Sequence, residues 1–231
     1  MTSPLTMQSS NSSLQSVYES VRRRASSMGN DFMQSDLPEN FGEVVSGVYR
    51  SAFPQPWSFS ALRRLGLRTI VTLVDEPYTP EHMSFLKETG IAHIRILVEP
   101  NKDPAIKSPD YVICQILEIM LDKANHPVLI HCNKGKHRTG CVIACFRKLQ
   151  GWRIEDTLAE YQTHSFPKSR PLDQRFIIAF DASPLSSLAQ VSEVKMWQSS
   201  NHAKALSEEN AMDQTSSSNR HLPSLGKIRV T

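Results

Sequence analysis

Short apolar strands that alternate with amphipathic helices between residues 41 and 182 predict an α/β domain. Short β-branched segments are followed by longer segments with helical periodicity. Two of the helical segments begin with Ser or Thr before Pro, and several end at Gly. The segment HPVLIH is continuously apolar, as strands buried on both faces of a parallel sheet are. We therefore expect a mainly parallel sheet of about four to five strands flanked by about six helices.

The first half of this domain alternates strands with helices. Residues 43–52 (EVVSGVYRSA) predict a strand pair or a bent strand. A helix is predicted at 56–66, followed by a β-branched strand at 69–74 (TIVTLV). The next helix covers 79–90 (TPEHMSFLKETG), in which a threonine is the expected N-cap, a proline follows it and a glycine ends the helix.

The second half repeats the same alternation. A strand at 92–97 is followed by a helix at 108–123 with one apolar face. The apolar strand at 126–131 leads at once into a helix at 139–151, where two cysteines four residues apart are expected to pack as small apolar side chains. Two further helices are predicted at 153–164 and 171–180.

Two polar segments flank this region. Residues 1–40 are rich in Ser, Asn and Gln, and residues 183–231 have a similar composition. Such segments lack the apolar residues needed to bury a core, so we expect a domain at 41–182 between two mostly disordered tails. Apolar residues at helical spacing between Leu14 and Met28 leave room for a short amphipathic helix in the first tail.

The composition excludes several classes of function. A net charge of +3 is too small to indicate a nucleic-acid partner, and no run of eighteen apolar residues predicts a membrane span. Four cysteines without disulfide-framework spacing suit a reducing compartment, so we expect a cytoplasmic protein with access to the nucleus left open. No cluster of His and Cys has the spacing of zinc ligands, and we expect no metal or other cofactor.

The segment LIHCNKGKHRTG (129–140) concentrates positive charge around one thiol. The strand ends at His131 and the next helix begins near Arg138, so the loop between them can turn its amides inward as an anion-binding nest. The ligand site of an open α/β sheet lies at this end of the strands. Amides, helix dipole and cations all stabilise an anion here, so we expect Cys132 to be largely thiolate.

Five residues separate Cys132 from Arg138. That spacing lets the loop wrap a tetrahedral anion, with the guanidinium forking onto two oxygens opposite the sulfur. The thiolate is then an in-line nucleophile that forms a phosphocysteine. Thr139 is expected to hydrogen-bond the sulfur as it leaves, and His131 to help hold Cys132. Glycines at 135 and 140 remove Cβ atoms where the loop turns tightly.

A general acid is expected on a second loop, EPNKDPAIKSP at 99–109. Asp103 is the favoured candidate because it lies on a polar, proline-bounded connection from a strand to a helix. The other reading of Asp103 is a solvated carboxylate before a proline. Four carboxylates are less favoured candidates: Asp75, Glu76, Glu99 and Asp110.

The loop carries more positive charge than a single phosphate requires, which suits a compact polyanion bearing many phosphates. Cationic side chains on the loop at 99–109 and just before the helix at 171–180 are also expected to reach the opening of this site. The alternative is that these side chains face outward as ordinary solvated surface. The substrate-binding candidates are Lys102, Asn133, Lys134, Gly135, Lys136, His137, Lys168 and Arg170.

From residue 41 to about 181 the chain resembles the plant and fungal atypical dual-specificity phosphatases. HCNKGKHRTG, NKDP, RKLQGW and EYQTHSFPKSRPLDQRFI carry this resemblance. It implies a dual-specificity-phosphatase-like fold and a cysteine-dependent phosphatase. Family members similar to the yeast diphosphoinositol polyphosphate phosphohydrolase cleave the β-phosphate of inositol pyrophosphates. The usual Trp-Pro-Asp loop is absent, and Asp103 stands where relatives often have glutamate.

The favoured function is therefore hydrolysis of the β-phosphate of inositol pyrophosphates through a phosphocysteine. The main alternative is a protein-tyrosine or dual-specificity phosphatase that acts on phosphoproteins with the same Cys132 and Arg138. A phosphate-binding pseudoenzyme is disfavoured because Cys132, Arg138 and Thr139 are all present. A rhodanese-like sulfurtransferase also uses an arginine-containing cysteine loop, but it has no need of Lys136 and Thr139.

Overall fold

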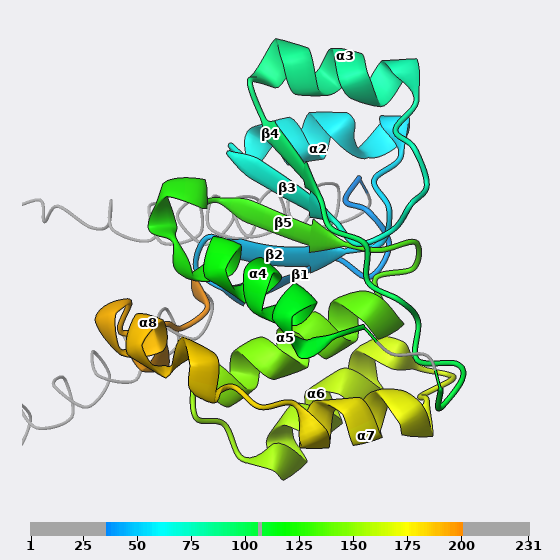
Figure 1. The fold of residues 1–231 in the computed structure, drawn as a ribbon. Coiled ribbons are helices and arrows are strands. Elements are labelled where there is room, and N and C mark those ends of the chain that lie inside the picture. Colours follow the sequence, from blue (N-terminus) through cyan, green and yellow to red (C-terminus); the bar gives the residue numbers. More distant parts are fainter. Residues whose placement is uncertain (1–35, 106–107, 201–231) are drawn as a thin grey trace, which may run out of the picture.

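The computed structural model describes residues 36–105 and 108–200. Its centre is a five-stranded sheet in the order β1-β2-β5-β3-β4. The first two strands pair antiparallel and the other three pairings are parallel, which confirms the predicted mainly parallel sheet (Figure 1). The strands are β1 (Gly42–Val45), β2 (Val48–Ser51), β3 (Thr69–Thr72), β4 (Ala92–Arg95) and β5 (Val128–His131).

Seven α-helices lie within the described residues, close to the expected number. Helices α2 and α3 cover one face of the sheet, and the longer α4 and α5 cover the other, with α6 and α7 packed outside α5 (Figure 1). The helices are α2 (Phe59–Arg64), α3 (Pro80–Thr89), α4 (Asp110–Leu121), α5 (His137–Leu149), α6 (Ile154–Ser165), α7 (Pro171–Ala179) and α8 (Ser186–Val191).

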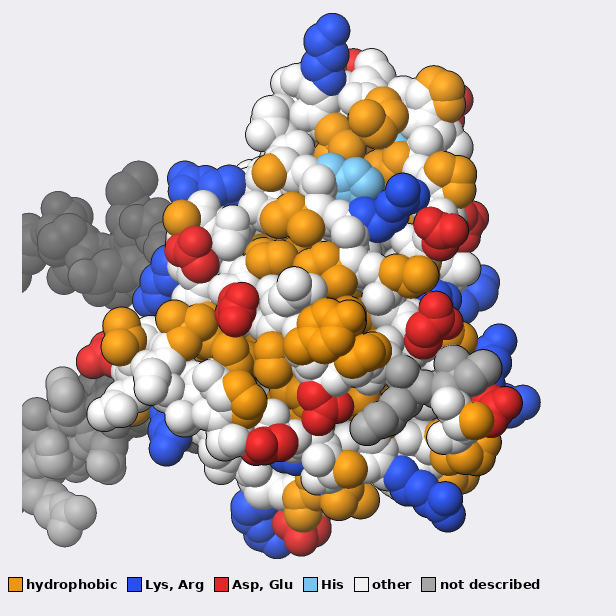
Figure 2. Space-filling model, viewed as in Figure 1, with side chains coloured by type: hydrophobic (Ala, Val, Ile, Leu, Met, Phe, Trp, Pro, Cys, Tyr) orange, Lys and Arg blue, Asp and Glu red, His pale blue; other side chains and the backbone are white. Residues whose placement is uncertain are grey.

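Side-chain alternation along the strands divides the core into two clusters. Ile70 and Leu129 point into the smaller cluster with the apolar side chains of α2 and α3. Val71 and Ile130 point the other way, into the larger cluster beneath α4 and α5. Strand β4 is at the edge of the sheet and is half exposed. On the side of the molecule that Figure 2 shows, hydrophobic side chains lie between scattered charged ones.

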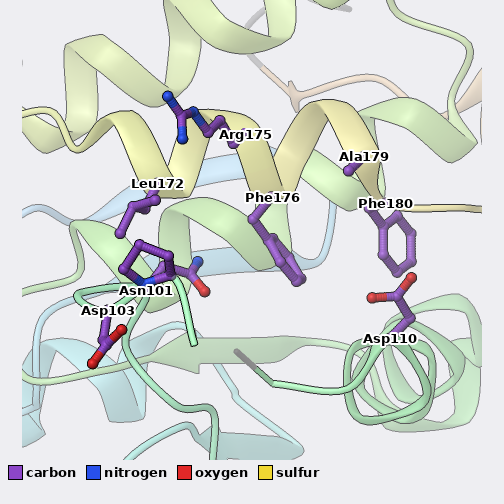
Figure 3. Close-up of a pocket in the computed structure, with 9 residues that line it drawn as sticks. Asn101, Asp103, Asp110, Leu172, Arg175, Phe176, Ala179 and Phe180 are labelled. Carbon is purple, nitrogen blue, oxygen red and sulfur yellow. The ribbon is translucent and has the colours of Figure 1, made fainter. Parts of the chain in front are cut away.

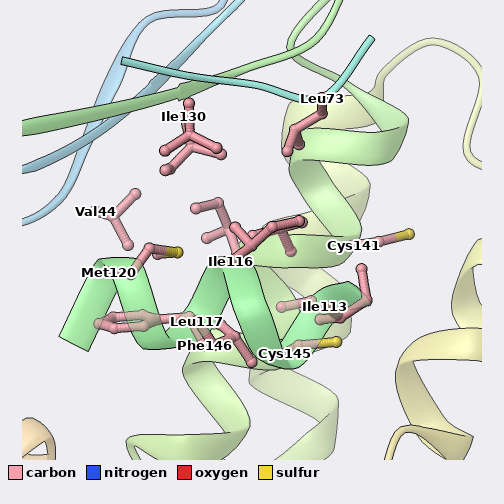
Figure 4. Close-up of a cluster of buried hydrophobic side chains, with 14 of the residues drawn as sticks. Val44, Leu73, Ile113, Ile116, Leu117, Met120, Ile130, Cys141, Cys145 and Phe146 are labelled. Atoms are coloured by element: carbon pink, nitrogen blue, oxygen red, sulfur yellow. The ribbon is translucent and has the colours of Figure 1, made fainter. Parts of the chain in front are cut away.

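Helix α5 follows β5 directly and is deeply buried, with ten of its 13 residues buried. Cys145 packs beside Phe146 against the apolar side chains of α4, whereas the sulfur of Cys141 points away from α4 and accepts a hydrogen bond from Asn101 Nδ2 at 3.7 Å (Figure 4). Burial raises the pKa of both thiols, so both are neutral. Both cysteines are buried in the core as predicted, but Cys141 also has a polar partner.

The strand register brings the carboxyl ends of three parallel strands together. Ser51 pairs with His131, and Thr72 pairs with His131 on its other side. The loops that follow β2, β3 and β5 therefore leave the sheet at the carboxyl ends of the strands, where ligands bind in open α/β sheets. This edge holds the cysteine loop, as expected.

The predicted end of the domain at residue 182 is wrong. Short helices cover Ser183–Leu185, Ser186–Val191 and Val194–Met196. Leu185 and Val194 are buried in the larger core cluster, and the Gln150 side chain donates hydrogen bonds to the carbonyls of Val194 and Trp197. The prediction failed because this segment is mostly polar, and the few apolar residues that pack on α4 and α5 are separated by polar ones.

The predicted end of the N-terminal tail at residue 40 is also wrong, because residues 36–40 are described and Asn40 donates a hydrogen bond to the carbonyl of Gly135. Residues 1–35, with the amphipathic segment, and residues 201–231 lie outside the described part of the chain.

Candidate active site

The cysteine loop runs from the end of β5 to the start of α5. Cys132 follows the last strand residue and is only 3% exposed, while α5 begins at His137. Arg138 is therefore in the first turn of the helix, and the amides of that turn face the same space as the thiol. The strand, loop and helix stand where the sequence predicted them.

The backbone carbonyls of the loop point away from its centre. Each accepts a hydrogen bond from outside the loop or from the helix that follows it. The donors are the amides of Phe53 and Gly140 and the side chains of Asn40 and Arg50. Because a trans peptide points its N–H opposite to its C=O, the next amides are turned inward and form an anion-binding nest. The accepting carbonyls are those of Asn133, Lys134, Gly135 and Lys136.

Two glycines allow this loop to pack closely. Gly135 has φ +64°, and a Cβ there would lie 2.5 Å from the backbone carbon of Ser51. A Cβ on Gly140 would lie 2.9 Å from Cδ2 of Tyr161 in α6. No larger residue fits either position without displacing its neighbour, so the predicted need for glycine is confirmed.

His131 is fully buried beneath the loop. Its Nε2 lies 2.8 Å from the hydroxyls of both Thr72 and Tyr78. Burial lowers the pKa of His131 to about 3, so the imidazole is neutral at physiological pH. His93 joins the cluster with Nε2 2.9 Å from Thr72 and its ring stacked on Tyr78. These three partners were not identified from the sequence, because they follow or lie on other strands.

Thr139 is buried in the first turn of α5. Its hydroxyl has no hydrogen-bond partner among the described groups, so the expected bond to the sulfur is absent in this structure. The hydroxyl remains available to donate. A role for Thr139 when the sulfur leaves stays a prediction.

The predicted substrate-binding side chains of the loop lie in two environments. Asn133 and Lys134 are exposed and line a pocket of about 200 Å³ with Trp57. Lys136 instead donates from Nζ to the carbonyl of Phe166, at 2.7 Å. The structure thus leaves Lys134 free to meet a ligand and ties Lys136 to the chain after α6.

His137 belongs to a buried network around Asp173, which is 1% exposed. Asp173 Oδ2 accepts from the Tyr161 hydroxyl at 2.6 Å and from His137 Nδ1 at 3.0 Å. Its Oδ1 accepts from Asn101 Nδ2 at 3.0 Å. Burial lowers the pKa of His137, Arg170 adds to the lowering, and Asp173 opposes it. Asp173 thereby ties the cysteine loop to the loop after β4.

Asp173 was predicted only as part of the segment EYQTHSFPKSRPLDQRFI and had no role of its own. The signal that could have identified it is a carboxylate in the first turn of a helix whose later residues are apolar. The charge of Arg170 contributes to the lowered pKa of His137, and the predicted role of Arg170 in substrate binding stays a prediction. Lys102 and Lys168 are exposed, and their contribution to binding stays a prediction.

The predicted acid, Asp103, lies on the second loop and is exposed. Its Oδ1 accepts from the amide of Ala105 at 2.9 Å. With Asn101 on the same loop, it lines a pocket of about 270 Å³ against Arg175 and Phe176 of α7 (Figure 3). Within the described residues it makes no hydrogen bond to the cysteine loop, so its role as acid stays a prediction.

Nothing in the described residues suggests a metal site or a membrane crossing. No three His, Cys, Asp or Glu side chains there gather as metal ligands require. None of the described helices has the length and apolarity needed to cross a membrane.

Comparisons with known proteins point to one family. A sequence model described as "Tyrosine phosphatase family" matches residues 37–200. The inositol diphosphatase SIW14 of Saccharomyces cerevisiae is 46% identical over 153 residues, which are 66% of this chain and 54% of that protein. The inositol diphosphatase DSP4 of Arabidopsis thaliana is 45% identical over 148 residues, which are 64% of this chain and 75% of that protein. The chain thus spans about half the length of the yeast relative.

Solved structures agree with this grouping. The core catalytic domain of the PP-IP phosphatase SIW14 from S. cerevisiae, in complex with citrate, matches with a TM-score of 0.65 and 43% identity. The match covers 70% of this chain and 98% of that domain. TpbA of P. aeruginosa matches with a TM-score of 0.55 at 22% identity, over 66% of this chain and 91% of that one. This second likeness concerns the fold alone.

Proposed function

We propose, from the premise that this chain belongs to the tyrosine phosphatase family, that it hydrolyses the β-phosphate of inositol pyrophosphates through a phosphocysteine. The cysteine loop carries this proposal. Its four outward carbonyls leave inward amides above a buried thiol, and Arg138 follows in the first turn of α5. Such a nest binds a phosphoryl group and stabilises the charge that develops on its oxygens.

The first step transfers the phosphoryl group to Cys132. The thiolate electron pair forms the S–P bond, and the P–O bond to the inositol-bound phosphate breaks with its electron pair on that oxygen. The guanidinium of Arg138 and the loop amides hold the equatorial oxygens. In the second step water attacks the phosphocysteine, which releases inorganic phosphate and the thiolate.

A phosphoanhydride suits the arrangement around this loop. Its leaving group is a phosphate, which is a stable anion and needs little protonation. This agrees with an acid candidate, Asp103, whose carboxylate is exposed and bonded within its own loop. Lys134 at the pocket edge and Arg170 near His137 add positive charge for the further phosphates of the substrate.

The relatives support the same substrate class. Two proteins at 45% and 46% identity bear the name inositol diphosphatase. The matched region extends over the cysteine loop, α6 and α7, so the network around Asp173 lies within the shared part of the chain.

Phosphate release without added metal tests the proposal. Purified protein is given a 5-diphosphoinositol polyphosphate or a phosphotyrosine peptide, with Cys132→Ser as the blank. Cys114→Ser is the matched control, because Cys114 is half-buried on α4 and away from the loop. We expect Cys132-dependent release that favours the pyrophosphate and is unchanged in the control. Preference for the peptide would make the chain a protein phosphatase instead.

A further inference from the structure

Arg50, the third residue of β2, lies under the cysteine loop with 2% of its surface exposed. Its aliphatic part lies against Gly42, and its Nη2 reaches toward Gly140 at the start of α5. Taking a guanidinium out of water is costly unless it is well paired. The pairing of Arg50 is incomplete, since its Nε is buried without a hydrogen-bond partner.

The hydrogen bond that Arg50 does make is with the cysteine loop. Nη2 donates to the carbonyl of Gly135 at 2.7 Å. Burial lowers the pKa of Arg50 to about 10, while the charges of Glu160 and Cys132 favour its protonated form and Arg147 opposes it. The guanidinium thus stays a cation at physiological pH.

Asn40 supports the same carbonyl from the other side. Its Nδ2 donates to Gly135 O at 2.9 Å and lies 3.4 Å from Lys134 O. The side chain is itself held by His164, whose Nδ1 donates to Asn40 Oδ1 at 3.0 Å and whose carbonyl accepts from Nδ2. Asn40 has φ +54°, a left-handed conformation that Asn tolerates better than most residues.

The two donors decide which way one peptide of the loop faces. Gly135 O and the N–H of Lys136 belong to the same planar unit and point in opposite directions. Two donors outside the loop hold the carbonyl outward, so the Lys136 amide is held inward, toward the phosphate site. Gly135 has φ +64°, a region from which a free glycine peptide turns readily.

We propose that Arg50 and Asn40 are positioning residues that keep the Gly135–Lys136 peptide turned for phosphate binding. Each acts through the hydrogen bond that it donates to the Gly135 carbonyl. The inference rests on the phosphate chemistry of the family and not on the substrate proposed above.

Two affinities measured by calorimetry, for tungstate and for inorganic phosphate, report the geometry of the nest. In Arg50→Met we expect both affinities to fall about tenfold or more. In Asn40→Ala we expect a smaller fall in both. Arg50→Lys should restore part of the affinity, because it keeps a cationic donor.

Arg147→Lys is the matched control, since Arg147 is also buried but bonds Glu160, Gln150 and Val44 instead of the loop. It should leave both readouts within about twofold of wild type. Equal losses in this control, or readouts within twofold of wild type in folded Arg50→Met, would overturn the proposal. If Arg50→Met does not fold, Asn40→Ala decides, and wild-type affinities in that variant would overturn the proposal. Both probes lack inositol, so failure of the proposed substrate leaves these outcomes intact.

Discussion

The cysteine loop and the loop that carries Asp103 lie at the same edge of the sheet but are built differently. In the first, four consecutive carbonyls are bonded outward and Gly135 lies directly against the end of β2. In the second, residues 102–105 are exposed, and the firm anchors are Asn101 and the bond from the Glu99 amide to Ser108. The loop of the proposed nucleophile is therefore held in place before binding, whereas the loop of the acid candidate is held by far fewer contacts.

This difference agrees with the chemistry proposed for the site. Attack on phosphorus requires amides and guanidinium in place before the reaction, because their reorganisation would add to the barrier. Departure of a phosphate requires little proton donation, so a loosely held carboxylate is tolerated. Asp173 contacts both parts, through His137 and Asn101, and is the link between them.

The largest expected effect follows from filling the space at Gly135. In Gly135→Ala the new Cβ meets the Ser51 backbone at 2.5 Å with φ +64°, so we expect a loss of about 3 kcal/mol or more in unfolding free energy. Gly90→Ala is the control, because φ is +70° there but no atom lies within 4 Å. Its expected cost in urea denaturation is about 1–2 kcal/mol. Equal losses of unfolding free energy in the two variants would show that the cysteine loop shifts to accommodate a Cβ as easily as the open helix end at Gly90.

Next in size is the loss of the link between the loops. Asp173→Asn replaces an acceptor of three hydrogen bonds by an amide whose NH2 faces donors, and we expect about 2 kcal/mol of destabilisation. We also expect kcat/KM to fall about tenfold, since His137 and Asn101 lose their common partner. Asp122→Asn, which alters an exposed turn at Ala124, should leave kcat/KM unchanged. An unaltered kcat/KM in Asp173→Asn would mean that the two loops act independently.

The buried imidazole beneath the cysteine loop predicts a pH dependence. His131 has a folded-state pKa of about 3, below its ordinary value near 6.5, so the unfolded chain binds a proton that the folded chain does not. Stability therefore falls as pH decreases from 6.5 toward 3, by up to about 1.4 kcal/mol per pH unit. Urea denaturation between pH 5 and 7 measures this slope, which should be smaller in His131→Gln. The same slope in both proteins would contradict the conclusion that His131 has a lowered pKa in the folded state.

The smallest effect is expected on the exposed loop. Asp103→Asn should reduce hydrolysis of an inositol pyrophosphate by less than about threefold, and hydrolysis of a phosphotyrosine peptide by more. The peptide releases a phenolate, which needs a proton more than a phosphate does. Steady-state rates on the two substrates give the ratio. A similar loss on both would remove the distinction between a preorganised nucleophile and a dispensable acid.

Most of the architecture followed from local signals. The strand at β5, the helix at α5 and the ends of α3 were predicted because apolar periodicity, proline and glycine act over a few residues. The C-terminal segment was mistaken for a tail because its buried residues, such as Leu185 and Val194, are separated by polar ones. Docking of such a segment depends on a surface that only the folded core provides.

By itself the sequence determined the strand–loop–helix and the candidate nucleophile and guanidinium that it carries, because Cys132 to Arg138 is one short continuous segment. Only the tertiary structure decided what holds that segment. The donors to Gly135 come from Asn40 and Arg50, which precede it by 95 and 85 residues. Such pairings depend on strand order and on packing across the sheet, and no local pattern in the chain encodes them.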